Sequence, residues 1–329
     1  MSVVKAPQTK LANPLAGFIS IQVVMLKRLR TAAVDIYVQY EAAGLPVLYR
    51  RAGYSLESQK LFGLAEAGVE QVYVRLEDFQ GFGTHLLESV EAANDQEQVP
   101  YGERFAALQM ALAVEIERTA RLLDCGPYAS LSEETGRKLT SLLAANDVLP
   151  RDLYRLARHD FNTFTHVTNV ASYMVVLAER MGITDHSELE QVAVGAMLHD
   201  VGKRFIPSTI LNKPARLDPI ERAIIETHPQ RGYEDLYDRE ELNLGQKMMV
   251  YQHHERVDGN GYPVGILAKD IHLWAKMLAV VDVFDAMTGS RPYRRPATSR
   301  EAMDYIMQNA GTHFDQEAVR CWNSAMNPA

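Results

Sequence analysis

Residues 253–265 of this 329-residue chain read His-His-Glu-Arg-Val-Asp-Gly-Asn-Gly-Tyr-Pro-Val-Gly, a histidine pair followed by a glycine-rich turn. Other histidines and aspartates recur between residues 166 and 282, on segments whose apolar residues follow helical spacing. Together with His253 and His254, the candidates are His166, His199, Asp200, His228 and Asp282. Imidazole and carboxylate are ligands of first-row transition metals, and this set suffices for two ions that share a bridging carboxylate. The stretch therefore predicts a helical bundle with a binuclear metal centre.

Taken singly, some of these residues have simpler explanations. His166 lies in the middle of an expected helix, where a histidine is more often part of the core, and His228 could be only a cation at a helix end. Asp282 is different, because it follows the apolar residues 277–281, and a carboxylate buried there needs a partner charge or a metal. Asp200 has two oxygens and is the natural bridge, and Gly202 is expected to let the backbone turn after it.

The composition is that of a globular protein, with 47% hydrophobic and 23% charged residues. The net charge of −8 argues against long nucleic acid as the main partner. Cys125 and Cys321 match no metal-ligand spacing, which favours free thiols in a reducing compartment. No apolar run reaches the ~18 residues of a membrane span, and residues 15–25 lack a signal-peptide cleavage site. We therefore expect a cytoplasmic protein without a membrane span.

Two regions differ in their pattern. Residues 1–97 are expected to form a small α/β domain, with strands at 36–40, 45–50 and 69–76 and a helix at 55–67. Residues 98–150 are expected to form a helical connector, with helices at 101–123 and 133–145. Residues 151–329 are almost all helical in pattern, so the fold class is mainly α. The helices are expected at 161–180, 189–199, 219–227, 248–254, 271–288, 301–309 and 317–325.

The motifs resemble those of the HD-GYP family, a branch of the HD-domain metal-dependent phosphohydrolases. The resemblance extends over about residues 155–329. His199-Asp200-Val201-Gly202-Lys203 matches the signature of the HD domain, and residues 253–265 match the HHExxDGxGYPxG pattern of the family. Further matching segments are residues 282–288, 291–294 and 311–315. The resemblance implies an HD-type bundle that hydrolyses the bacterial second messenger cyclic di-GMP to linear pGpG, GMP or both.

The same resemblance implies the roles of single residues. One metal ion would be bound by His166, His199, Asp200 and Asp282, and the other by Asp200, His228, His253 and His254. A water whose pKa the two cations lower would attack phosphorus in line. The expected catalytic residues are Lys203, which assists the leaving oxygen, and Asp200; the expected substrate contacts are Arg291, Arg294, Tyr262 and Lys203. Glu255, Asp258 and Asp285 are expected to fix the loop or orient ligands. Iron is the expected metal, with manganese or zinc as alternatives.

The chain departs from the family pattern at two positions. Asn162 stands where members with a third metal have a glutamate, one helical turn before His166, so two ions are expected rather than three. Gln316 stands where the family usually has a proline, and we expect only a structural effect.

Two other functions remain open on the sequence. One is an HD-GYP module with weak turnover that senses a cyclic dinucleotide or binds a protein partner, for example a GGDEF-type domain, through the loop around Tyr262. The other is a phosphohydrolase that acts on a mixed cyclic dinucleotide. By analogy of architecture alone, the N-terminal region is expected to regulate the protein or to form a homodimer, with or without the connector.

Overall fold

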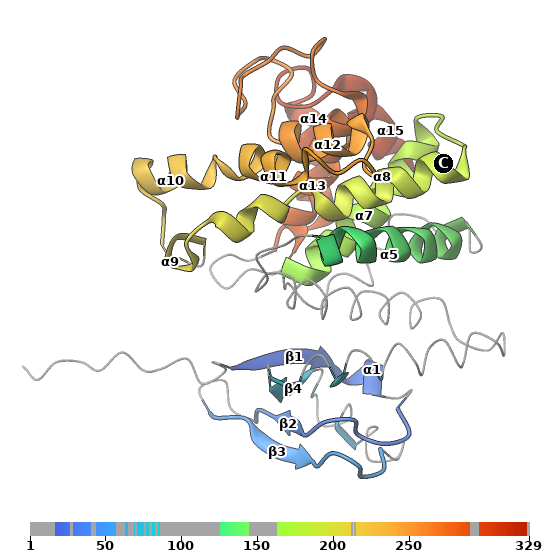
Figure 1. The fold of residues 1–329 in the computed structure, drawn as a ribbon, viewed down its shortest axis with the longest axis vertical. Coiled ribbons are helices and arrows are strands. Elements are labelled where there is room, and N and C mark those ends of the chain that lie inside the picture. The colour runs from blue at the N-terminus through green and yellow to red at the C-terminus, as the bar shows by residue number, and fades with distance from the viewer. Residues whose placement is uncertain are drawn as a thin grey trace, which may run out of the picture. The chain divides into compact units, whose positions relative to one another are not determined.

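The computed structural model describes residues 17–26, 29–40, 44–56, 63–64, 69, 71–75, 77–78, 81–82, 85, 126–144, 163–211, 213, 215–289 and 296–327. The chain divides into two compact units, Met1–Val99 and Pro100–Ala329, which Figure 1 shows as a small sheet and a helical bundle. The described part of the expected connector is α5 (Gly126–Ala144), which packs against a helix of the second unit. Among the described residues, no helix is both long and apolar enough to cross a membrane.

The first unit contains a four-stranded antiparallel sheet in the order β1-β4-β2-β3. Its elements are β1 (Phe18–Gln22), α1 (Val23–Leu26), β2 (Ile36–Val38), β3 (Val47–Arg50) and β4 (Gln71–Arg75). The three expected strands are confirmed in shorter form. Strand β1 was not expected, although it lies in the apolar stretch of residues 15–25. Of the expected helix at 55–67, only Gly63 and Leu64 are described as helical.

The second unit is a bundle of helices. Its elements after α5 are α7 (Thr163–Arg180), α8 (His186–Leu198), η1 (Val201–Phe205), α9 (Ser208–Leu211), α10 (Pro219–Ile225), α11 (His228–Leu236), α12 (Leu244–Gln252), α13 (Leu273–Thr288), α14 (Ser299–Gln308) and α15 (Gln316–Met326). All seven helices expected after residue 151 are present. The short elements η1, α9 and α11 were not expected, and the expected helix at 101–123 lies outside the described residues.

The core of the bundle forms around α7 and α13, which pack against each other and carry mostly buried apolar residues. Tyr173 of α7, Phe284 of α13 and Trp322 of α15 contact one another edge to face or at a tilt, with ring centroids 5.4–5.7 Å apart. A core of this kind holds both helices rigidly, so polar side chains on their inner faces have fixed positions.

Capping residues set several helix starts. Asp218 accepts hydrogen bonds from the amides of Ile220 and Glu221, which confirms the expected start of α10 at Pro219. Asn243 and Gln246 form a reciprocal capping box at α12. This box starts α12 four residues before the position that hydrophobic spacing alone indicated.

Candidate metal centre

The polar residues predicted as ligands come from five different parts of the bundle. His166 lies on α7, and His199 and Asp200 follow the last turn of α8. His228 is the first residue of α11, His253 and His254 follow α12, and Asp282 lies on α13. Six of the seven side chains are buried, and His254 is half-buried. The structure brings all seven together.

The first cluster consists of His166, His199, Asp200 and Asp282. The Nε2 atom of His166 lies 3.2 Å from Asp282 Oδ1 and 3.9 Å from Asp200 Oδ2. The Nε2 atom of His199 lies 3.3 Å from Asp200 Oδ2 and 3.9 Å from Asp282 Oδ1. Two imidazoles and two carboxylates therefore point their free atoms at one small volume.

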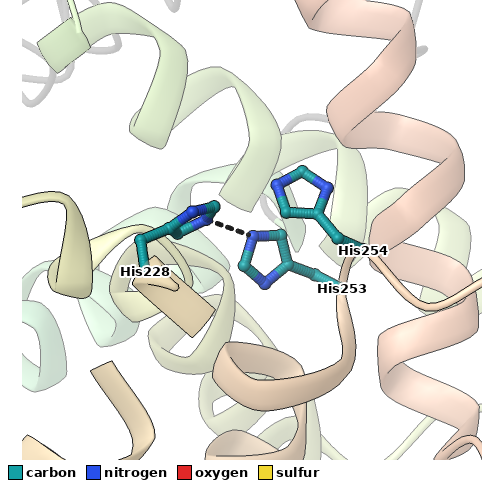
Figure 2. Close-up of side chains that lie close together, drawn as sticks. All are labelled: His228, His253 and His254. Carbon is teal, nitrogen blue, oxygen red and sulfur yellow. Dashed lines mark hydrogen bonds between the residues drawn. The ribbon is translucent and has the colours of Figure 1, made fainter. Parts of the chain in front are cut away.

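The second cluster consists of His228, His253 and His254, whose side chains lie close together in Figure 2. The Nε2 atoms of His228 and His253 lie 3.2 Å apart, and the ring of His254 lies 4.1 Å from that of His253. Asp200 Oδ1 lies 3.3 Å from His228 Nε2 and 3.8 Å from His253 Nε2. One oxygen of Asp200 thus faces each cluster.

These distances fit metal ligation. Atoms that each lie about 2.1 Å from one ion are separated by about 3.0–3.4 Å, and the shortest ligand pairs of both clusters have this spacing. Two of the atoms, His199 Nε2 and Asp200 Oδ1, are buried without a hydrogen-bond partner among the described residues. Because a buried polar atom without a partner is costly, both atoms fit a ligand that the protein itself does not supply.

The other ring nitrogen of most of these histidines is already engaged. The Nδ1 atoms of His199, His228 and His253 lie 2.6–3.1 Å from backbone carbonyl oxygens of the preceding turn, to which they can donate. The Nδ1 atom of His166 lies 2.8 Å from Asp285 Oδ2, and Asn169 donates to the other oxygen of Asp285. These contacts fix each ring with Nε2 toward the centre, as is usual for metal-binding histidines. Asp285 was expected to orient a ligand in this way, whereas the contact of Asn169 was not expected.

The electrostatics of the two clusters differ. Burial lowers the pKa of His254 to about 3, and burial together with the neighbouring His254 lowers the pKa of His253 well below its usual value. Neutral imidazoles are the form that binds metals. Although burial opposes protonation, hydrogen bonds to Asp282 and Asp285 raise the pKa of His166 to about 10. Both carboxylates therefore favour a positive charge at this place, which either a proton or a metal ion can supply.

The loop after the histidine pair is held by acidic side chains. The buried carboxylate of Glu255 accepts hydrogen bonds of 2.8–3.1 Å from the amides of Val264, Gly265 and Ile266. Asp258 accepts hydrogen bonds from both Arg256 and the amide of Asn260. Glu255 and Asp258 thus fix the loop, as expected.

Two glycines allow η1 and α11 to approach closely. A Cβ atom on Gly202 would lie 2.0 Å from the carbonyl oxygen of His228 and 2.6 Å from the amide of Gly232. Gly202 lies in a turn after Asp200, as expected, since the amide of Lys203 donates to the carbonyl oxygen of Asp200 at 2.9 Å, but its φ is not positive. Its missing side chain also lets His228 reach Asp200.

Of the other residues singled out in the sequence, some lie at the centre and others lie outside the described residues. His228 begins α11 instead of ending a helix, and its ring is buried. Lys203 donates a hydrogen bond to Asp200 Oδ2, and the ring of Tyr262 lies 4.7 Å from that of His254. Arg291, Arg294 and Asn162 lie outside the described residues.

Comparisons with known proteins agree with this architecture. A family model described as HD domain matches residues 144–318. The chain is 30% identical over 295 residues to the cyclic di-GMP phosphodiesterase PA4108 of Pseudomonas aeruginosa, covering 84% of this chain and 70% of the relative. It is 38% identical over 159 residues to the 3'3'-cGAMP-specific phosphodiesterase 2 of Vibrio cholerae, covering 48% of this chain but only 30% of that protein.

A solved structure has the same fold. The HDG"Y"P protein Bd1817 from Bdellovibrio bacteriovorus aligns with a TM-score of 0.67 at 20% identity, over 93% of this chain and 98% of that chain. The HD-domain model, the P. aeruginosa relative aligned over 295 residues, and the motifs of residues 199–203 and 253–265 all indicate the same family. The chain belongs to the HD-domain family, in its HD-GYP branch.

Proposed function

We propose that this chain is a metal-dependent phosphodiesterase that hydrolyses cyclic di-GMP to linear pGpG, GMP or both. The observation that carries the proposal is the position of Asp200, whose two oxygens face two separate groups of buried histidine nitrogens. The name of the P. aeruginosa relative, which aligns with most of this chain, supports the substrate.

Two divalent transition-metal ions fit the two clusters. His166, His199, Asp200 and Asp282 would hold one, and Asp200, His228, His253 and His254 the other. Ligands rich in histidine favour iron, our first choice, or manganese or zinc over magnesium and calcium. When bound, the ions would supply a water of lowered pKa and positive charge for the phosphate oxygens.

The protein's own residues position the phosphodiester and the leaving group. Lys203 Nζ, which donates to Asp200, would also donate to the leaving 3'-oxygen. The water would form a bond to phosphorus and lose a proton, the bond from phosphorus to the 3'-oxygen would break, and that oxygen would take a proton from Lys203. The product keeps a 5'-phosphate. Tyr262, whose ring lies at a tilt beside that of His254, would form one wall of the substrate site, and Arg291 and Arg294 are proposed to bind phosphate oxygens.

A second substrate, a mixed cyclic dinucleotide, is supported by the name of the V. cholerae relative. The loop after the histidine pair is also a candidate for protein binding, for example of a GGDEF-type domain, because Val264 and Leu267 on it are 58% and 53% exposed. Dimerisation through the N-terminal unit or the connector, and regulation by that unit, stay part of this proposal.

Turnover of a substrate panel tests the function. The chain, purified without oxygen and loaded with iron, should convert cyclic di-GMP to pGpG or GMP, detected by mass spectrometry. The Asp200→Ala variant should show no conversion. Tight binding of cyclic di-GMP without turnover would favour the sensor function, and faster turnover of 3'3'-cGAMP would favour the mixed substrate.

A further inference from the structure

A pair of opposite charges lies beside the metal centre and is not part of it. Arg222 Nε and Glu226 Oε1 lie 2.7 Å apart, one helical turn from each other at the end of α10. Glu226 precedes the proposed ligand His228 by two residues, so its backbone is anchored at the edge of the second cluster. No side chain of α10 is buried, and the side chains of Arg222 and Glu226 are 72% and 32% exposed.

Tyr262 connects this pair with the centre. Its ring packs on His254 at 4.7 Å and approaches His228 at 6.5 Å. Burial raises the pKa of its phenol, and the carboxylates of Glu226, Asp200 and Asp282 raise it further. The ring thus lies beside the second cluster, whose His228 follows Glu226 by two residues. A base attached to a phosphodiester at the centre would lie alongside this ring on its way to α10.

The chemistry of the pair matches one base in particular. A carboxylate only accepts hydrogen bonds, and guanine presents two donors side by side, N1–H and the N2 amino group. A guanidinium only donates, and guanine presents two acceptors, O6 and N7. Adenine lacks the paired donors, because its N1 is an acceptor. A Glu–Arg pair therefore distinguishes guanine from adenine by both charge and hydrogen-bonding direction.

We propose that Glu226 and Arg222 read the guanine next to the scissile phosphate and so determine the base specificity of the enzyme. This inference rests on the proposed function and adds the residues that select the base. Neither residue touches the reacting phosphorus, so both act as specificity residues rather than catalytic ones.

The test is a change of base preference in Glu226→Gln. A glutamine offers one donor and one acceptor, which match the Watson–Crick edge of adenine. Cyclic di-GMP, 3'3'-cGAMP and cyclic di-AMP are compared by kcat/KM. The variant should lower the ratio of cyclic di-GMP to cyclic di-AMP at least about 10-fold, since an unmatched polar edge is strongly rejected. Arg222→Ala should weaken turnover of cyclic di-GMP without a gain for cyclic di-AMP, because the carboxylate remains.

The products of 3'3'-cGAMP give a second readout that loss of structure does not imitate. This substrate has two different phosphodiester bonds, and the base held at α10 decides which bond lies at the centre. Wild type and Glu226→Gln should yield opposite ratios of the two linear products. Glu234→Gln is the matched control, because this exposed carboxylate on α11 also has a partner one turn away, Gln230.

The results of these experiments distinguish a failure of the base-specificity proposal from a failure of the proposed phosphodiesterase function. If wild type hydrolyses cyclic di-GMP but Glu226→Gln changes neither ratio, the inference is wrong and the function stands. If wild type binds the nucleotides without turnover, the same preference is measured from the three Kd values by calorimetry, and an unchanged order in Glu226→Gln again overturns the inference. If wild type binds none of the three, both proposals are wrong.

Discussion

Asp200 is the residue on which both halves of the centre depend. Its Oδ2 faces His199 and its Oδ1 faces His228, each at 3.3 Å. Lys203 and His199 lower the pKa of this carboxyl well below its usual range, although burial opposes ionisation. The group is therefore an anion at neutral pH, which is the state that a bridging ligand requires.

Removal of this bridge should release both ions together. We expect Asp200→Ala to contain less than half of the wild-type metal at both positions, because each ion loses a charged ligand. Elemental analysis by mass spectrometry measures the content. Asp270→Ala, a change at an exposed carboxylate outside both clusters, should keep the full content. A full pair of ions in Asp200→Ala would contradict the bridge.

Asp285 is expected to act on the metal only through His166. It accepts hydrogen bonds from His166 Nδ1 and from Asn169, and it belongs to neither cluster. Asp285→Ala should weaken the binding of one ion about 10- to 100-fold, as loss of such a partner usually does. Competition with a chelator measures both affinities, and Asp304→Ala on the exposed face of α14 is the control. Equal weakening of both ions would show that Asp285 does not act through His166 alone.

At the scale of single elements, the approach of η1 to α11 sets the distance between the two clusters. Gly202→Ala would place a methyl group 2.0 Å from the carbonyl oxygen of His228, so the two elements must separate. We expect the free energy of unfolding to fall by about 1–3 kcal/mol or more. Urea denaturation measures it, and Gly63→Ala is the control, because a Cβ there meets no atom within 4 Å. Equal stability of Gly202→Ala and wild type would contradict the close packing.

Helix α13, which carries Asp282, starts with a pH-sensitive cap. The Nδ1 atom of His272 accepts a hydrogen bond of 3.2 Å from the amide of Trp274. A protonated imidazole ring cannot accept this hydrogen bond. Burial lowers the pKa of His272, so the folded state resists protonation, and its stabilising contribution is lost as the pH falls below about 6.5 through the folded pKa.

An asparagine cap has no such dependence. His272→Asn should match wild type at pH 7.5 and be more stable than wild type at low pH, by about 1 kcal/mol. Urea denaturation of both proteins at pH 7.5 and at pH 4.5 measures the difference. A difference that does not change with pH would show that His272 does not titrate as a cap.

The sequence predicted the long elements and the seven side chains that the fold brings together, because these follow from local patterns. Helical spacing revealed α7 and α13, and the segments around Asp200 and His253 matched a family pattern. What it did not predict depends on contacts between distant segments or on short elements. Asn169 reaches Asp285 across 116 residues, and α11, which reads His-Pro-Gln-Arg-Gly-Tyr-Glu-Asp-Leu, has too few apolar residues for a hydrophobic period to be recognised. Strand β1 was missed because its apolar residues were considered only as a leader sequence.

At the scale of the whole molecule, α5 belongs to the bundle that holds the metal centre. Its residues Leu139 and Leu143 are buried in the main core, and Tyr128 donates a hydrogen bond to the carbonyl oxygen of Met197. The helix lies in the unit Pro100–Ala329. We therefore propose that the phosphohydrolase domain requires residues before 151.

Truncation at two positions tests this boundary. A chain of residues 100–329 should fold and bind metal as the full chain does. A chain of residues 151–329 should be less stable by at least about 3 kcal/mol, because the burial of two leucines is lost. Thermal denaturation followed by circular dichroism compares the two. Equal melting temperatures would show that α5 is only a connector.

One carboxylate, that of Asp200, is proposed to join two metal ions that are held by separate groups of residues. Anomalous X-ray diffraction at the iron absorption edge, from crystals of the iron-loaded full chain, tests it most directly. We predict two anomalous peaks per chain, one bound by His166, His199 and Asp282 and the other by His228, His253 and His254, with Asp200 bound to both. A single peak, or two peaks that do not share Asp200, would contradict it.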